Sequence, residues 1–68
     1  MVFGERLKEL RTERKISQME LAKATGITQS AIAKWELGRT EPSASALIKL
    51  SAYFSETVDY LLGLEQNV

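Results

Sequence analysis

The 68-residue chain contains no cysteine and no histidine, only one proline, and four glycines. Without cysteine it can form no disulfide or thiolate metal site, and without histidine it lacks the commonest general base and metal ligand. Its carboxylates lie scattered over helical surface positions without the spacing of an acid–base pair, and no glycine-rich phosphate loop follows a strand. We therefore expect no enzymatic activity, no cofactor and no metal.

Long apolar runs are also missing from the sequence. No stretch approaches the roughly 20 apolar residues of a membrane helix, and charged Glu5 and Arg6 come too early for a signal peptide. We expect a cytoplasmic protein with no membrane association. The length suits one small domain over residues 1–68, with its core at about 3–63 and a short tail at 64–68. Because this leaves no room for a ligand-sensing domain, no small-molecule ligand is expected.

Apolar residues recur at helical spacing along the chain, so helix packing must supply the stability. The pattern predicts five helices, at about 3–14, 17–25, 28–37, 43–54 and 57–62. Pro42 is expected in the first turn of the fourth helix, Thr57 as the cap of the last helix and Gly63 as its stop. The expected core residues are Phe3, Leu7, Leu10, Ile16, Leu21, Ala22, Ile27, Ile32, Trp35, Leu47, Leu50, Phe54, Val58, Leu61 and Leu62. The predicted fold class is all-α, a compact five-helix bundle.

Residues 17–38 hold two short capped helices around one glycine. Ser17 followed three residues later by Glu20 is a capping box, which predicts a helix start. Gly26 can adopt the left-handed conformation that ends a helix, and Thr28 is the next N-cap. Two helices that meet at such a tight corner form a helix-turn-helix, which presents its second helix to the DNA major groove.

The second helix of this pair carries a polar face. Ile32 and Trp35, three residues apart, mark its buried side. The residues that must then point outward, called the outward row below, are Gln29, Ser30, Ala33 and Lys34. Glutamine can pair with adenine, serine can donate or accept, lysine can reach guanine or a phosphate, and an alanine methyl can contact a thymine methyl. A solvated helix face is the alternative, because these are ordinary surface residues.

From about Phe3 to Leu62 the sequence resembles the phage repressor and Cro type of helix-turn-helix domain, the Xre-like family. The matching motifs are Ser17-Gln18-x-Glu20-Leu21-Ala22, Gly26-Ile27-Thr28-Gln29-x-x-Ile32, Trp35-Glu36-x-Gly38-Arg39, Pro42 and Val58-Asp59-Tyr60-Leu61-Leu62-Gly63. The resemblance implies a lambda-repressor-like fold and sequence-specific binding to double-stranded DNA by a small transcriptional regulator, a repressor, located at the nucleoid when bound. Ser51 and Glu56 depart from the residues usual in this family.

The resemblance also implies roles for individual residues. Base reading is assigned to Gln29, Ser30 and Lys34, and contact with the DNA backbone to Gln18, Thr28, Arg39, Thr40 and Arg11. Gln18 and Thr28 stand at helix starts, where free amides favour a phosphate, although Thr28 is equally well explained as a cap alone. Arg11 is implied to pair with Glu36, which would tie the first helix to the end of the recognition helix. A solvent-exposed arginine is the alternative.

The formal net charge of zero argues against nucleic-acid binding. The charges are nevertheless divided, because residues 1–40 carry a net +3 and residues 41–68 a net −3. The positive half contains the helix-turn-helix. We expect a shallow salt dependence of DNA binding, since few phosphates can be neutralised by each copy.

A homodimer on a two-fold operator is expected from the resemblance, with half-sites about 34 Å apart. One domain alone buries too little DNA for specific recognition. The candidate interface residues are Tyr60, Leu64 and Val68, each of which can equally belong to the core or to the tail. The rival function is a protein-binding adaptor or antitoxin-like module with the same fold, which would favour apolar groups in the outward row.

Overall fold

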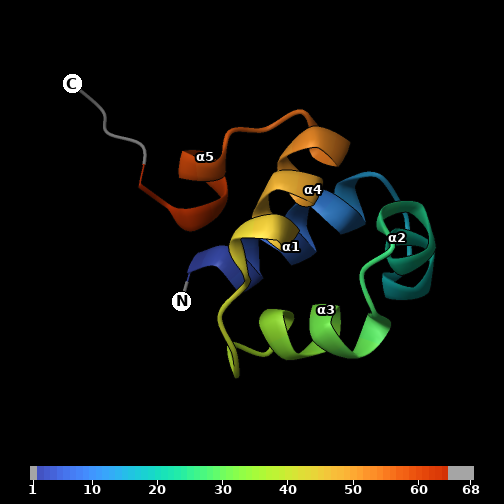
Figure 1. The fold of residues 1–68 in the computed structure, drawn as a ribbon. Helices are drawn as coiled ribbons and strands as arrows, with labels where there is room; N and C mark the ends of the chain where they lie inside the picture. Colours follow the sequence, from blue (N-terminus) through green and yellow to red (C-terminus); the bar gives the residue numbers. More distant parts are fainter. Residues whose placement is uncertain (1, 65–68) are drawn as a thin grey trace.

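The computed structural model describes residues 2–64, which form five helices and no strand. The helices are α1 (Val2–Glu13), α2 (Gln18–Thr25), α3 (Gln29–Glu36), α4 (Ala44–Phe54) and α5 (Val58–Leu62). Each predicted helix end lies within one residue of the observed end, and the all-α prediction is confirmed. In Figure 1, α3 lies along the bottom of the domain, α2 stands at one end of it, and α5 lies at the opposite end of the molecule. Over the described part of the chain, no helix is both long and apolar enough to cross a membrane.

One apolar core holds all five helices together. Its buried residues are Phe3, Leu7, Leu10, Leu21, Ala22, Ile32, Trp35, Ala46, Leu50, Phe54 and Leu61. Ile16, Ile27, Leu47 and Leu62 are half-buried and pack against this cluster. Val58 was expected in the core but is only half-buried, whereas Ala46 was not expected there and is buried. Because every helix contributes to the cluster, the orientation of α3 depends on the whole domain.

The predicted caps of α2 and α3 are confirmed. Ser17 Oγ accepts a hydrogen bond from the backbone N–H of Glu20 at 3.0 Å, and Glu20 Oε1 accepts one from the Ser17 N–H at 2.8 Å. Gly26 has a φ of 76°, which ends α2 in the left-handed conformation. Thr28 Oγ1 accepts from the N–H of Ala31 at 3.2 Å and starts α3. The chain therefore turns from α2 into α3 over only three residues, 26–28.

At the other end of the chain, Thr57 caps α5 and Gly63 ends it, as predicted. The prediction for Pro42 is wrong. Ser43 is the N-cap of α4, since it is extended and its hydroxyl accepts from the N–H of Ala46 at 3.2 Å. Pro42 therefore precedes the cap and lies outside the helix.

Two helices are followed by a left-handed residue that is not glycine. Lys15, after α1, has a φ of 57° and donates its N–H to Thr12 O, while Ile16 donates to Arg11 O at 3.1 Å. This pair of bonds is the Schellman arrangement, and it directs Ile16 back to the core. Ser55, after α4, has the same φ.

The two residues that depart from the family pattern are bonded to each other, Ser51 from the last turn of α4 and Glu56 from the loop that follows it. The Ser51 hydroxyl donates to the carbonyl of Glu56, and the Glu56 N–H donates to the Ser51 carbonyl at 3.2 Å. Ser51 thus closes the turn in which Glu56 lies.

Helix α1 crosses the end of α3 at very short range. Gly4 is buried, and a Cβ atom at this position would lie 2.1 Å from the carbonyl oxygen of Trp35. The ring of the preceding residue, Phe3, packs edge-on against the Trp35 ring, with 5.7 Å between centroids. Glycine is therefore required at residue 4 for this crossing, which holds the C-terminal end of α3.

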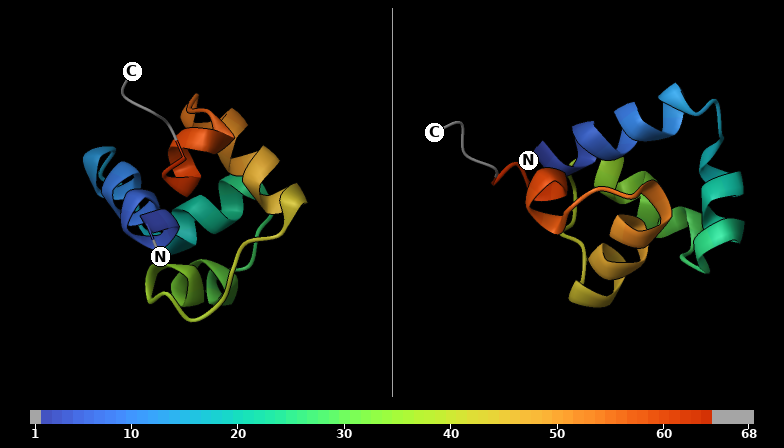
Figure 2. Two further views of the ribbon diagram at one scale, coloured as in Figure 1. Left: turned by 90° about the vertical axis from the view of Figure 1, so that its left-hand side faces the viewer. Right: turned by 90° about the horizontal axis from the view of Figure 1, so that it is seen from above.

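Two arginines of the N-terminal segment hold the C-terminal helices. Arg6 donates to the carbonyl of Tyr60 at 2.6 Å, and its guanidinium lies 4.3 Å from the centroid of the Tyr60 ring. Just after α1, Arg14 donates to the carbonyl of Phe54 at 2.9 Å and lies 5.0 Å from that ring centroid. Figure 2 shows α1 beside α5 in both views, with the start of α1 next to the end of α5.

Candidate nucleic-acid interface

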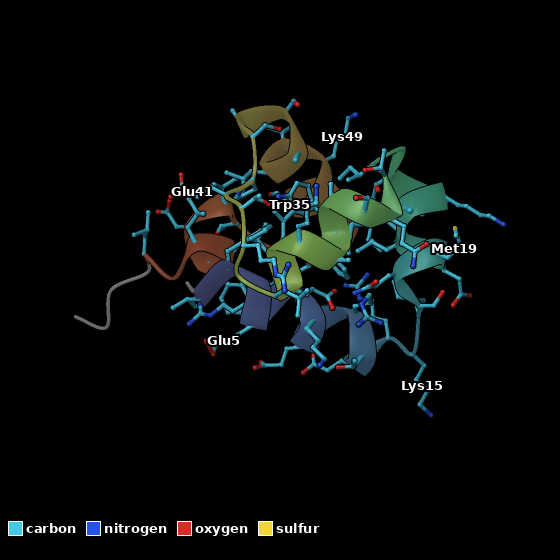
Figure 3. The ribbon with its side chains drawn as sticks, turned by 90° about the horizontal axis from the view of Figure 1, so that it is seen from below. Glu5, Lys15, Met19, Trp35, Glu41 and Lys49 are labelled. Carbon is cyan, nitrogen blue, oxygen red and sulfur yellow. The ribbon has the colours of Figure 1, made fainter. Side chains whose placement is uncertain are left out.

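The candidate interface is centred on α3, whose buried side is formed by Ile32 and Trp35 as expected. The polar side chains of the outward row, Gln29, Ser30 and Lys34, are exposed, and Ala33 between them is half-buried. In Figure 3, seen from below, α3 crosses the front of the molecule. The outward row is therefore accessible to a partner along the length of the helix.

The end of α3 is closed by a second Schellman arrangement. Gly38 has a φ of 73° and donates its N–H to Trp35 O at 3.0 Å, and Arg39 donates to Lys34 O at 2.9 Å. This bond holds the Arg39 backbone against the last turn of α3. Arg39 and Thr40 are both exposed there, next to the end of the outward row.

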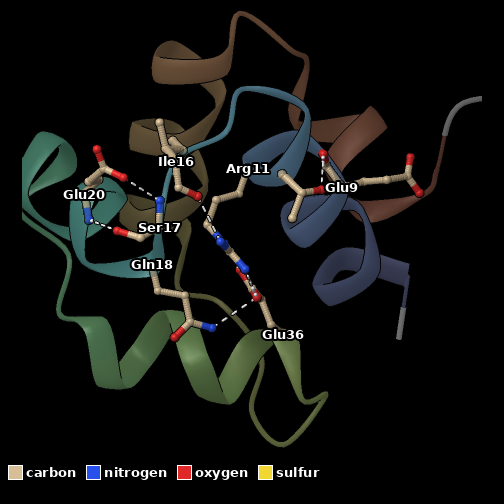
Figure 4. A network of polar contacts seen from close by, with 8 residues as sticks. Glu9, Arg11, Ile16, Ser17, Gln18, Glu20 and Glu36 are labelled. Carbon is tan, nitrogen blue, oxygen red and sulfur yellow. Dashed lines mark hydrogen bonds and ion pairs between the residues drawn. The ribbon is translucent and has the colours of Figure 1, made fainter.

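A polar network joins α1, α2 and α3 beside this surface (Figure 4). Arg11 donates from Nε to Glu36 Oε2 at 2.8 Å and from Nη2 to Glu36 Oε1 at 3.0 Å. Its remaining nitrogen donates to the carbonyl of Ile16 at 2.9 Å. Gln18 Nε2 donates to Glu36 Oε1 at 3.1 Å. The Arg11–Glu36 ion pair implied by the resemblance is thus present, and it also holds the side chain of Gln18.

This ion pair is largely buried. Only 12% of the Arg11 side chain and 5% of the Glu36 side chain are exposed. The hydrogen bonds to Glu36 raise the pKa of the Arg11 guanidinium above its ordinary value, with a further contribution from charge attraction, although burial opposes the shift. The Arg11 guanidinium therefore stays charged, and its two hydrogen bonds to Glu36 brace α1 against the end of α3.

The residues assigned to the DNA backbone do not share one environment. Gln18 is half-buried at the start of α2, and Thr28 is exposed at the start of α3, where its oxygen serves as the cap. Arg11 has all three guanidinium nitrogens bonded inside the domain. Sequence reasoning did not foresee the bond from Gln18 to Glu36, because nothing in the spacing of the two residues indicates it.

Sequence reasoning also missed Leu37, which is 68% exposed. It is the C-cap of α3, so the helix reaches it in its regular conformation. The available signal was its spacing, four residues after Ala33 and three after Lys34, which places it on the outward side. The exposure of Leu37 beside the outward row could therefore have been predicted from the sequence.

The candidate dimer residues fall in different places. Tyr60 is half-buried, packs against the core and lies under Arg6. Leu64 is 60% exposed. Val68 lies outside the described residues. Of the two that the structure describes, Leu64 is the more exposed.

Comparison with known proteins gives several matches to this arrangement. A helix-turn-helix family model matches residues 7–61. The HTH-type transcriptional activator BcrR of Enterococcus faecalis is 39% identical over 68 residues, which is 100% of this chain and 33% of BcrR. The SPbeta prophage-derived uncharacterized HTH-type transcriptional regulator YonR of Bacillus subtilis is 43% identical over 61 residues, which is 90% of this chain and 56% of YonR.

One phage relative also has a solved structure. Repressor protein C2 of Salmonella phage P22 is 39% identical over 61 residues, which is 90% of this chain and 28% of that protein. The crystal structure of the P22 c2 repressor with synthetic operator 9T superposes with a TM-score of 0.87 at 37% identity, covering 96% of this chain and 98% of that one. The chain spans between 28% and 56% of the length of these three relatives. The prediction from the sequence motifs is confirmed, and the chain belongs to the helix-turn-helix family.

Proposed function

We propose that this chain is the sequence-specific DNA-binding unit of a transcriptional regulator and that it inserts α3 into the major groove of double-stranded DNA. The observation that carries the proposal is the exposure of Gln29, Ser30 and Lys34 on one side of a helix whose other side is buried. An α-helix fits the major groove, and these side chains suit base edges. The similar P22 c2 repressor was crystallised with an operator, which supports the same kind of partner.

In this proposal, base-edge contacts come from the three exposed polar residues of the outward row. Gln18 and Thr28 bind phosphates at the starts of α2 and α3, where backbone amides point toward an anion. Arg39 and Thr40 bind the backbone at the far end of α3. Arg11 acts as a positioning residue, because its nitrogens already hold Glu36 and the loop carbonyl of Ile16. A direct phosphate contact by Arg11 would require it to give up one of these bonds.

The regulator acts as a homodimer in the cytoplasm, bound to the nucleoid when it occupies a two-fold operator, and represses by blocking polymerase. A second copy is required because one small module buries only about 600–1,000 Å² on DNA. Leu64, exposed at the end of the described chain, is the residue of the candidate interface that best suits contact with that copy. No small-molecule effector, cofactor or catalytic step belongs to this proposal.

Selection of bound duplexes from a random DNA pool tests the proposal. We expect a two-fold sequence with half-sites 10–10.5 base pairs apart, or a multiple of that spacing, because recognition helices of a dimer enter successive grooves about one turn apart. A pool from which no duplex is enriched would contradict DNA recognition and favour the protein-binding adaptor. An enriched single half-site would contradict the dimer.

Two substitutions then separate base reading from backbone binding. Gln29→Ala is expected to cost about 1–3 kcal/mol of binding free energy and to relax the preference at one base position. Arg39→Ala is expected to weaken all sequences alike, since a phosphate contact carries no sequence information. Lys49→Ala, an exposed cation on α4, is the matched control and should leave binding unchanged. Unaltered base preference in the Gln29→Ala protein would refute its assigned role.

A further inference from the structure

We propose that Leu37 is a specificity-determining residue that recognises the methyl group of a thymine at the end of the α3 contact. This inference rests on the proposed function and goes beyond it, because none of the base contacts assigned above is apolar. Leu37 is 68% exposed, the largest exposed fraction among the large hydrophobic residues of the described chain. Its side chain contributes little to the core, so its apolar surface is free to bind a partner.

The backbone places Leu37 in line with the outward row. Its φ of −84° and ψ of −5° continue the right-handed helix, and its N–H donates to Ala33 O at 3.1 Å. Leu37 therefore lies one turn beyond Ala33 on the same side of α3. The left-handed Gly38 follows immediately and ends the helix. The position of Leu37 is thus fixed by its own hydrogen bond to the last turn of α3 and by the Schellman turn that follows it.

Charge identifies the occupant of this apolar end as DNA. Exposed Lys34 precedes Leu37 by three residues, and exposed Arg39 follows it by two. Two cations beside one leucine suit a polyanion and disfavour an apolar protein surface, where both charges would lose water without a partner. Among the bases, only thymine presents a methyl group in the major groove. An apolar side chain at the end of a base-reading helix therefore fits thymine better than any other base edge.

Replacement of thymine by uracil tests this contact without altering the protein fold. Uracil keeps the O4 acceptor and the base pairing and removes only the methyl group. In the operator obtained by selection, each thymine is replaced in turn, and the dissociation constant is measured for the wild-type chain and for Leu37→Ala. Ile48→Ala is the matched control, because Ile48 is 65% exposed and lies on α4.

We expect wild-type binding to weaken by about fourfold at one or two thymines per half-site, the ratio for one buried methyl group. In Leu37→Ala the same replacements should have no effect, whereas Ile48→Ala should behave as wild type. Equal effects of uracil in wild type and Leu37→Ala would overturn the assignment and leave DNA binding intact. Failure of the wild-type chain to select any duplex would instead overturn both proposals. Thermal unfolding of the Leu37→Ala protein verifies that it is folded.

Discussion

Replacing Arg11 and Glu36, singly and together, measures how strongly α1 braces the end of α3. The two side chains share two hydrogen bonds, of 2.8 and 3.0 Å, and are 12% and 5% exposed. An exposed ion pair contributes only about 0.2–1 kcal/mol. Loss of one partner from a buried pair costs about 3–5 kcal/mol, because the other charge is left without its counterion.

Each single alanine variant keeps one bond to the residue that remains. Arg11 retains the Ile16 carbonyl, and Glu36 retains the amide of Gln18. We therefore expect Arg11→Ala and Glu36→Ala each to cost about 3 kcal/mol of unfolding free energy, at the lower end of the buried range. The double variant should cost about 4 kcal/mol, which corresponds to a coupling of about 2 kcal/mol.

The assay is urea unfolding followed by circular dichroism. A domain of this length is stable by roughly 3–10 kcal/mol, so all variants are measured in the same concentration of a stabilising osmolyte. Lys23→Ala with Glu41→Ala, both exposed, is the control pair and should be additive. Additive effects of Arg11 and Glu36 would refute the brace. So would a coupling that disappears in about 1 M NaCl, because salt screens exposed pairs far more than buried ones.

Three further predictions concern the helix crossing, a helix end and the charge distribution. Gly4→Ala should destabilise the domain by about 1–3 kcal/mol in urea unfolding, because its Cβ would clash with the Trp35 carbonyl; increased stability, as helix propensity alone predicts, would contradict the close approach. Lys15→Gly should stabilise it by about 0.5–1 kcal/mol in the same assay, since Lys15 has a φ of 57°; a loss of stability would show that the left-handed turn is not strained. The slope of log affinity against log salt should stay below about 5 per copy, because five exposed cations remain in residues 1–40 once Arg6, Arg11 and Arg14 are bonded internally; a slope near 10 per copy would contradict this.

Sequence patterns predicted most of the fold because the start of a helix in this chain is marked by a single capping residue. A hydroxyl at Ser17, Thr28 or Thr57 can cap a helix wherever the chain is extended before it, and all three do so. Pro42 was misplaced because proline is tolerated both inside the first turn and just before the cap. Only the hydrogen bond that Ser43 Oγ accepts from the N–H of Ala46 decides between the two.

Features that depend on distant parts of the chain could not be predicted in this way. Gly4 resembles any helical glycine until the Trp35 carbonyl is placed against it. Lys15 and Ser55 adopt a left-handed conformation that their residue types do not indicate. In the candidate interface, burial of Trp35 correctly predicted which side of α3 faces outward. The bond from Gln18 to Glu36 depends on how α2 meets α3 in space.

The arginines at positions 6 and 14 attach the C-terminal helices through main-chain oxygens of Tyr60 and Phe54. Every amino acid supplies such an oxygen, so substitution of either aromatic residue removes the ring contact but leaves the hydrogen-bond acceptor in place. These hydrogen bonds are therefore lost when either arginine is replaced, but their acceptors remain when Tyr60 or Phe54 is replaced. Variation at the exposed positions of α4 and α5 therefore need not break these two hydrogen bonds.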